Sequence, residues 1–481
     1  MFHRVFNIRT YWTITWVVVL LSAVLFSAID NKTLLPVGLG VSFTIYGAFT
    51  TFHKILQFLR AGIAYIRVSQ LEQEASRSGY MIPYGILSFG HEEAEHYYRQ
   101  HLQSIKNMNG QVCTIFLADG KTAANRDMRR WFDETFPPPL GFSLELPFDA
   151  FFSDLHGTQQ QYLLNQLGRL SPRPKYLFIM QAKGGKRKIM YTGIKLATAL
   201  YPAIGALGFT DSDTVIEPDA FAHLSRLFLR PQIGAVSGYV GILNVGKRQG
   251  GSFLSRLSAD RYWRAFNIER ASQSASGSVM CVSGPLGMYR VSALFRVLGA
   301  WYTSTFLGYE CTFGDDRELT NKLLGQGYEV WYNPRARCNT ETPTTIRRWL
   351  KQQTRWMKSA NREAINSFKQ VHRVAHPLWY TYELTYTTFF SLFLLIGIIF
   401  QCMLVFRERS LLPLLSLFIS VAFGGLLTGL VGFFITRDWN RFLAVFYGYY
   451  FMVFLLPARI VAILTIYNPS WGTSARANLK S

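Results

Sequence analysis

The sequence has few cysteines and few acidic residues. Its 481 residues include five cysteines, an odd number without the close spacing of a metal site. This pattern indicates reduced cytosolic thiols rather than a disulfide framework. Only 29 residues are acidic and 50 are basic, so the formal net charge is +21. The expected partners are therefore anionic, namely nucleotide sugars, an acidic polymer or an anionic membrane leaflet.

Two further features are missing. The basic residues are scattered and no nucleic-acid-binding motif is present, so nucleic acid is not an expected partner. The N-terminus does not read as a cleavable signal peptide, because its apolar run is long, lacks a clear small-residue cleavage site and is soon followed by another. With 49% hydrophobic residues, the chain has material for one large domain and membrane segments.

Two uncharged runs near the N-terminus, 11–29 and 34–52, are each long enough to cross a hydrocarbon layer of about 30 Å. They predict a transmembrane hairpin over residues 1–52, with both ends cytosolic because basic residues flank it. Residues 53–68 follow directly and carry apolar residues at helical spacing on one face. They predict a helix in the membrane interface, although a helix packed on a soluble core would show the same pattern.

The chain returns to the membrane after the middle region. Residues 384–406 and 411–436 predict two crossings, within a transmembrane segment 376–436. The last apolar stretch, 442–456, is short and is followed by Pro457. An interfacial or half-buried helix and a cytosolic tail are therefore expected over 437–481.

Between these segments, residues 69–343 are polar and mixed. The apolar runs 112–118 and 176–180 predict buried strands, and helical stretches lie between such runs, which is typical of a parallel α/β sheet. Ligands of such sheets bind beyond the carboxyl ends of the strands, where Asp119 and Asp211 fall.

A carboxylate pair follows the strand-like segment at 207–209. Asp211 and Asp213 are two residues apart and can reach one Mg²⁺ or Mn²⁺ that neutralises a diphosphate. The alternative is an ordinary acidic turn.

Three more features can hold a nucleotide. The basic turn 183–187 carries two glycines, and its Lys183, Lys186 and Arg187 can balance a phosphate, although a solvated basic loop would look the same. Asp119 can accept hydrogen bonds from a uracil or a ribose. Glu93, or its neighbour Glu92, can do the same, unless it only stabilises a helix N-terminus.

A second carboxylate pair begins a predicted helix. Asp316 can act as general base on an incoming hydroxyl, while Asp315 is expected to cap the helix beside the acceptor. Upstream, Ser283, Gly284 and Pro285 form a rigid turn that can line an acceptor sugar, or can be purely structural. Cys281 beside it reads as a buried small residue rather than a nucleophile.

Gln352, Arg355 and Trp356 fall at i, i+3 and i+4 of a predicted helix and share one face. Gln352 and Arg355 are assigned to the donor diphosphate, and Trp356 offers an aromatic platform to the acceptor. The alternative is an amphipathic helix on the membrane surface, and residues 344–375 can serve both purposes.

Five motifs together resemble the membrane-embedded family-2 glycosyltransferases, most closely the hyaluronan synthases of vertebrate and algal-virus type. The likeness spans roughly residues 85–475, and the motifs are 262–270, 281–290, 314–317, 340–343 and 352–359. The resemblance implies an α/β, GT-A-like cytosolic domain inserted between transmembrane and interfacial helices. It also implies UDP-GlcNAc and UDP-GlcA as donors, Mg²⁺ or Mn²⁺ as cofactor, and a polymer threaded through the membrane helices.

The resemblance assigns roles to single residues. It gives Asp119 to the nucleotide, Asp213 to the metal, Asp316 to the base and Trp356 to the acceptor. By the same likeness, Trp471, Gly472 and Thr473 form a tail segment that closes over bound donor. The sequence departs from the family pattern at His91, where a tyrosine is usual, and it ends at Ser481, where vertebrate members continue with further membrane helices.

The sequence therefore predicts a processive, inverting glycosyltransferase of the plasma membrane that makes hyaluronan. A chitin or chitin-oligosaccharide synthase that uses UDP-GlcNAc alone is the alternative within the class. An inactive membrane scaffold or glycan-binding protein is the alternative from another class. A binding module has no need for both a metal site and a base, which argues against it.

Overall fold

The computed structural model describes residues 48–146, 165–168, 170, 173–246, 251–311 and 313–467. The predicted N-terminal hairpin lies almost wholly outside these residues, and the Trp471–Thr473 segment lies outside them entirely. The five cysteines are all free.

A nine-stranded sheet organises the middle of the chain, in the order β3-β4-β2-β1-β5-β8-β7-β11-β6. Its strands are β1 Tyr84–Gly90, β2 Cys113–Asp119, β3 Gly141–Glu145, β4 Tyr176–Gln181, β5 Ala206–Asp211, β6 Val215–Ile216, β7 Ile233–Ile242, β8 Gly287–Arg290 and β11 Glu329–Thr340. The first five strands in this order, which are β3, β4, β2, β1 and β5, are parallel, as predicted. The sheet is not parallel throughout, because β8 runs antiparallel to both β5 and β7, and β6 is antiparallel to β11.

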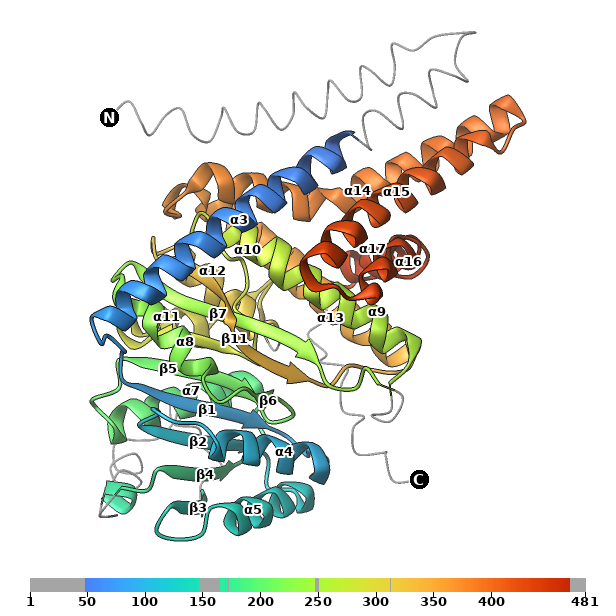
Figure 1. Cartoon of the computed structure of the whole chain (residues 1–481). Helices are drawn as coiled ribbons and strands as arrows, with labels where there is room; N and C mark the ends of the chain where they lie inside the picture. Colours follow the sequence, from blue (N-terminus) through green and yellow to red (C-terminus); the bar gives the residue numbers. More distant parts are fainter. Residues whose placement is uncertain are drawn as a thin grey trace.

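Helices cover both faces of the sheet (Figure 1). They are α4 Glu95–Lys106, α5 Ala123–Thr135, α7 Lys186–Leu200, α8 Ala220–Arg226, α11 Val291–Tyr302 and α12 Asp315–Leu324. The side chains of adjacent strand residues point to opposite faces. On β2, accordingly, Phe116 packs against Phe132 of α5, while Leu117 lies close to Gly193 of α7.

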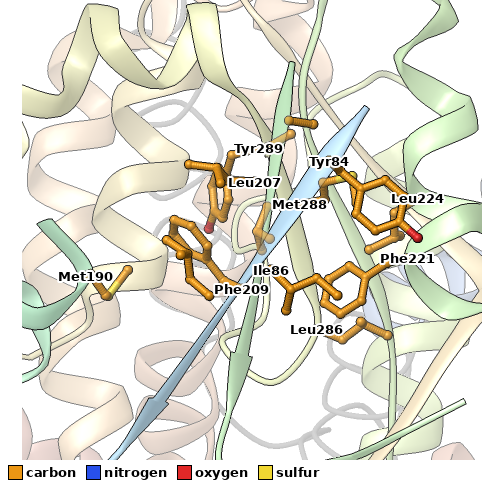
Figure 2. Close-up of a cluster of buried hydrophobic side chains, with 14 of the residues drawn as sticks. Tyr84, Ile86, Met190, Leu207, Phe209, Phe221, Leu224, Leu286, Met288 and Tyr289 are labelled. Carbon is orange, nitrogen blue, oxygen red and sulfur yellow. The ribbon is translucent and has the colours of Figure 1, made fainter. Parts of the chain in front are cut away.

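The core lies on both sides of β1 and β5. Figure 2 shows Phe209 and Tyr289 on one side and Tyr84 with Phe221 on the other. The rings of Phe209 and Tyr289 are 4.7 Å apart. Gly208 is required on the opposite face, because a Cβ there would come within 2.4 Å of the Phe221 ring. This two-sided packing fixes the strand ends at which the polar residues sit.

Helix α3, Ala48–Arg77, is one continuous helix of 30 residues. Its exposed side chains include the large apolar residues Phe52, Ile55, Leu59, Ile63 and Ile66. Its buried side combines the polar residues His53, Gln57 and Arg60 with Ala61, Ala64, Val68 and Leu71. The exposed apolar side chains suit a helix in the membrane interface, whereas Ala61, Val68 and Leu71 pack in the core of the sheet domain, so the interfacial placement of residues 53–68 stays a prediction.

Three helices at the C-terminal end are long and apolar enough to cross a membrane, among the described residues and by length and composition. They are α14 Pro377–Glu408, α15 Leu412–Thr436 and the helical stretch Trp439–Leu464, which includes α16 Leu443–Tyr450 and α17 Leu456–Leu464. The stretch Trp439–Leu464 is longer than the apolar run 442–456 that suggested a half-buried helix. Its expected interfacial placement stays a prediction.

A buried cluster of charged residues attaches the C-terminal apolar helices to the sheet domain. Asp260, on α9 Phe253–Arg264, accepts a hydrogen bond of 2.9 Å from Arg264 and lies 3.7 Å from Arg441 at the turn after α15. The Arg441 guanidinium also stacks 4.7 Å from the Trp263 ring. Asp260 is 1% exposed, so loss of either arginine would leave a buried charge less compensated.

Candidate active site

One large cavity, with a volume of about 2690 Å³, connects the sheet edge to the membrane-side helices. At one end it is lined by the loops after β1, β2 and β5. At the other it is lined by residues of α14, α15 and α16, including Leu394, Gly425 and Gly448. It also contains every predicted site residue that the structure describes.

The basic turn 183–187 is shaped by Asp119, the last residue of β2. The Asp119 carboxylate accepts hydrogen bonds from the backbone N–H of Gly184 at 2.8 Å and of Gly185 at 3.1 Å. Gly185 has φ 89°, a conformation that favours glycine, and it precedes α7. Asp119 thus holds the turn, and its expected contact with a uracil or ribose stays a prediction.

Lys183 and Lys186 remain beside the cavity at the start of α7. A helix N-terminus with backbone N–H groups and nearby cations favours an anion such as a phosphate. Lys186 forms an ion pair with Asp211, and the charges of Asp316 and Asp315 also act on it. Burial lowers the pKa of Lys186, but these carboxylates outweigh it and raise the pKa above its usual value.

The carboxylate pair lies at the carboxyl end of β5. Burial and the nearby charge of Asp213 raise the pKa of Asp211, while Lys186 opposes the rise. Asp213 is 8% exposed and accepts a hydrogen bond of 3.3 Å from Thr340 on β11. Between them, Ser212 donates to Glu93 at 3.1 Å, so the predicted Glu93 sits beside the pair.

These residues fit a divalent cation by the chemistry of the donor set. Two carboxylates, one of them made harder to ionise by the other, would be stabilised by a positive charge between them. The described residues contain no group of three His, Cys, Asp or Glu side chains that could hold a metal alone. Mg²⁺ commonly uses one or two carboxylates and takes its other ligands from water and substrate phosphates.

Arg187 lines the cavity, but its guanidinium is paired with two buried carboxylates. Its guanidinium donates to Asp315 at 2.7 Å and to Glu318 at 2.6 Å, and its side chain is 8% exposed. Both carboxylates are on α12, and Glu318 also lies 3.4 Å from Arg362 of α13, Ile346–Gln370. Arg187 was predicted to balance a phosphate. Its charge is paired in this buried network, and its expected contact with a phosphate stays a prediction.

The N-terminus of α12 also differs from the prediction. Gly314, rather than Asp315, is the N-cap residue. Gly314 has φ 76°, and a Cβ there would come within 1.8 Å of Ser359 on α13. Asp315 is 5% exposed and pairs with Arg187, so the structure gives it a role in packing. The following residue, Asp316, is half-buried and lines the cavity.

Asp316 faces the same cavity as the β5 carboxylates. Its charge acts on both Asp211 and Lys186. One of its oxygens accepts from the backbone N–H of Arg317 at 2.9 Å, and the Cys281 thiol lies 3.7 Å from the other. Burial and the charge of Asp316 raise the pKa of Cys281 to about 11. The thiol therefore stays neutral, as expected of a small buried residue that is not a nucleophile.

The turn at 283–285 lies close to the β5 carboxylates. A Cβ at Gly284 would meet the Asp211 carboxylate and the Lys186 ammonium, each at 3.4 Å. Ser283 and Pro285 line the cavity beside it. The small Gly284 therefore leaves the charged pair accessible, as a wall next to a bound sugar requires.

Helix α13 brings Gln352, Arg355 and Trp356 to the cavity. Trp356 is 40% exposed there. Trp349, one heptad earlier, is 3% exposed and packs edge-on against Tyr450. The two tryptophans thus differ, since one is buried between helices and the other offers ring surface to the cavity.

Sequence reasoning missed two residues of this site. Thr340 contacts Asp213, and Tyr262 lies beside Trp356 with ring centroids 6.4 Å apart. Both belong to motifs that carried the family resemblance, at 340–343 and 262–270. Threonine and tyrosine side chains are common in structural positions, so the residue type alone did not indicate a role for either. His91, where the sequence departs from the family pattern, lines the cavity together with Glu93.

Comparisons with known proteins identify the family of the chain. The family described as glycosyl transferase family group 2 matches residues 209–463. Hyaluronan synthase 3 of Xenopus laevis is 36% identical over 446 residues, covering 91% of this chain and 76% of that protein. Hyaluronan synthase 3 of Homo sapiens is 36% identical over 452 residues, covering 91% and 78%. A solved mannosyltransferase of Pyrobaculum calidifontis aligns with a TM-score of 0.45 and 14% identity, over 85% of this chain and 98% of that chain.

The family match and the relatives identify a UDP-sugar-dependent glycosyltransferase, and the mixed α/β sheet of its GT-A-like domain confirms the predicted fold class. The chain belongs to the family-2 glycosyltransferases and, within them, is similar to the hyaluronan synthases over most of its length. Donor sugars linked to UDP and a polysaccharide product follow from this membership, and the inactive-scaffold alternative is rejected.

Proposed function

We propose that the protein makes hyaluronan from UDP-GlcNAc and UDP-GlcA, as a processive, inverting transferase at the cytosolic face of the plasma membrane. The observation that carries the proposal is the shared cavity. The carboxylates of Asp211 and Asp213, the cavity-lining Asp316 and the exposed Trp356 border one space, which supports the proposal. The similarity to hyaluronan synthases supports the choice of product.

Donor binding is assigned to the sheet-edge end of the cavity. Lys183 and Lys186 neutralise the diphosphate with the α7 N-terminus, while Gln352 and Arg355 hold it from α13. Asp119, Glu93 and Asp211 shape or contact the nucleotide, and Asp213 is the metal ligand. When bound, Mg²⁺ or Mn²⁺ supplies positive charge that stabilises the departing UDP.

Acceptor binding is assigned to the opposite wall. Trp356 takes the sugar ring on its exposed face, and Cys281, Ser283, Gly284 and Pro285 border it. Asp316 removes the proton from the acceptor hydroxyl, which then attacks the anomeric carbon from the side opposite UDP. Direct attack inverts that carbon. The family likeness adds Trp471, Gly472 and Thr473 as a closing segment.

The continuation of the cavity between α14, α15 and α16 supports passage of the polymer through the membrane-side helices. We assign α3 to the membrane interface, because it exposes large apolar side chains, and α13 to the same cytosolic boundary. In this arrangement the catalytic domain faces the cytosol and the N-terminal hairpin crosses the plasma membrane.

The test is a two-donor assay. Membranes that contain the protein receive labelled UDP-GlcNAc, with and without UDP-GlcA, and with Mg²⁺, Mn²⁺ or a chelator. Polymer should form only with both sugars and a divalent cation, and hyaluronidase should digest it. Polymer from UDP-GlcNAc alone would contradict the proposal in favour of a chitin-like product. Full activity in chelator would contradict the metal assignment.

A matched pair of variants separates the metal ligand from its neighbours. Asp213→Asn should abolish the response to added Mg²⁺ or Mn²⁺, because it removes a charged oxygen ligand. Glu217→Gln, close in sequence but away from the cavity lining, should leave the metal response unchanged. Equal responses of the two variants would overturn the assignment of Asp213.

A further inference from the structure

Tyr262 lies between the proposed donor-binding and acceptor-binding parts of the cavity. It lies on α9, two residues before the end of that helix, and its side chain lines the cavity. The Tyr262 and Trp356 rings have centroids 6.4 Å apart and planes tilted by 51°. That separation is within the range of favourable aromatic pairs. Tyr262 therefore contacts the proposed acceptor platform directly.

The ring of Tyr262 is itself supported from behind. Phe266, in the π-helical turn Ala265–Arg270, lies 6.2 Å from Tyr262, and the Arg270 guanidinium stacks 3.9 Å from the Phe266 ring. Arg270 in turn donates from Nε to the Cys281 carbonyl at 3.1 Å. A row of rings thus runs from Trp356 to the wall that borders the acceptor.

Helix α9 holds Tyr262 on a rigid base. The neighbouring Trp263 is 6% exposed and packs under Arg441, and Arg264 pairs with Asp260 in the buried cluster of charged residues. Arg261 makes a two-fold ion pair with Glu269 at 2.9 and 3.0 Å. Residues on both sides of Tyr262 are therefore fixed, which limits the movement of its ring.

The phenol also lies within electrostatic reach of the donor side. Burial raises the pKa of Tyr262, Asp213 raises it further, and Arg270 and Arg355 lower it. The same side chain is therefore near the expected metal ligand, near the expected diphosphate ligand and in contact with Trp356.

We propose that Tyr262 is a positioning residue that braces the Trp356 indole and thereby sets how firmly an acceptor sugar is held against the donor site. The inference rests on the proposed role of Trp356 as acceptor platform. Trp356 leaves 40% of its surface exposed, so one side of the indole is open to a sugar while Tyr262 supports it from another direction. The ring of Tyr262, rather than its hydroxyl, provides the support.

The test compares Tyr262→Leu and Tyr262→Phe in the full-length protein in detergent or nanodiscs. Binding of a hyaluronan tetrasaccharide in the presence of UDP is measured separately from binding of UDP alone. Tyr262→Leu should weaken tetrasaccharide binding by roughly 3- to 10-fold, the range of one aromatic pair, and leave UDP binding unchanged. In turnover it should raise the acceptor KM more than it lowers kcat. Tyr262→Phe should restore near-normal values.

Tyr450→Leu is the matched control. Trp349 lies on α13, as Trp356 does, and its ring centroid is 6.1 Å from that of Tyr450. Tyr450→Leu removes this ring contact, and Tyr450 does not line the cavity. It should leave tetrasaccharide and UDP binding unchanged. If it weakened tetrasaccharide binding as much as Tyr262→Leu, a general disturbance of α13 would explain both variants and the proposal would fail.

Three other outcomes would contradict the proposed role of Tyr262 in positioning Trp356. They are equal loss of UDP and tetrasaccharide binding in Tyr262→Leu, a Tyr262→Phe variant as impaired as Tyr262→Leu, and no tetrasaccharide binding by the unaltered protein. The proposed function fails separately, if the unaltered protein forms no polymer from both donors. In that case the ratio of tetrasaccharide affinities still decides whether Tyr262 braces Trp356.

Discussion

Two charged regions meet at the start of α12 and are built from neighbouring residues. Behind the helix, Arg187, Asp315 and Glu318 form a buried network in which each charge has a partner within 2.7 Å. In front of it, Lys186, Asp211 and Asp316 share one cavity, and the pKa of Asp211 is raised by burial and by Asp213. The paired charges of Arg187, Asp315 and Glu318 stabilise the fold. The carboxylates around Lys186 outnumber the nearby cations, and such excess charge is typical of groups that take part in a reaction.

The difference explains why adjacent residues have separate roles. Lys186 and Arg187 follow each other on α7, and Asp315 and Asp316 follow each other on α12. Successive residues on a helix point about 100° apart, so one of each pair can face the core while the other faces the cavity. Four substitutions or conditions can break or sharpen this contrast.

The largest effect is expected for Asp316→Asn. Removal of the base should lower the rate of sugar transfer by about 10²- to 10⁴-fold, the range of general base catalysis. UDP binding and thermal stability should change little, because Asp316 is only half-buried. Transfer and UDP affinity are measured on the same preparation. Equal losses in both would contradict the role of Asp316 as base.

Arg187→Ala should act on stability rather than on the reaction. It leaves the buried Asp315 without its cation, which costs about 3–5 kcal/mol in the free energy of unfolding, while Glu318 keeps Arg362 and Lys322 as partners. Thermal melting of the detergent-solubilised protein measures the loss. A variant that melts normally but has a raised donor KM would show that Arg187 serves the phosphate after all.

Lys186→Ala should weaken donor binding by about 10- to 100-fold, the worth of a hydrogen bond to a charged group. It should also change the pH profile. Lys186 opposes the raised pKa of Asp211, so its removal raises that pKa further. An ionised Asp211 adds negative charge beside the metal ligand Asp213 and favours the cation there, so the acidic limb of the activity profile should move to higher pH. No movement would argue against the coupling of the two residues.

The smallest effect near neutral pH is expected for Glu269→Gln. Glu269 lines the cavity and its charge is balanced by nearby cations. Burial alone would raise its pKa, but Arg261 and Lys54 outweigh burial and lower it from 4.5 to about 2. A carboxylate with a lowered pKa stabilises the fold above its unfolded pKa and loses this contribution as the pH falls. Stability should drop between pH 4.5 and 2, and Glu269→Gln should flatten that part of the curve.

Local patterns in the sequence predicted much of this molecule. The strands β2 and β4, the helices α14 and α15 and the exposed face of α3 follow from hydrophobic runs and periodicity. The residues that converge on the cavity were also identified, because motifs at strand ends and helix starts carry local signals.

The remaining features depend on contacts between distant segments. The antiparallel insertion of β8 depends on pairing with β5 and β7, which its four residues do not specify. Arg187 and Asp315 lie 128 positions apart, and nothing local shows that they pair. The same holds for Tyr262, whose role depends on a tryptophan from another helix.

The stereochemistry of the bond formed tests the central claim most directly. UDP-linked donor sugars are α-configured at the anomeric carbon, and the product of a limited reaction can be examined by NMR. If an acceptor hydroxyl deprotonated by Asp316 attacks from the side opposite UDP, every new linkage should be β. A new α linkage would require a different mechanism and would contradict the account.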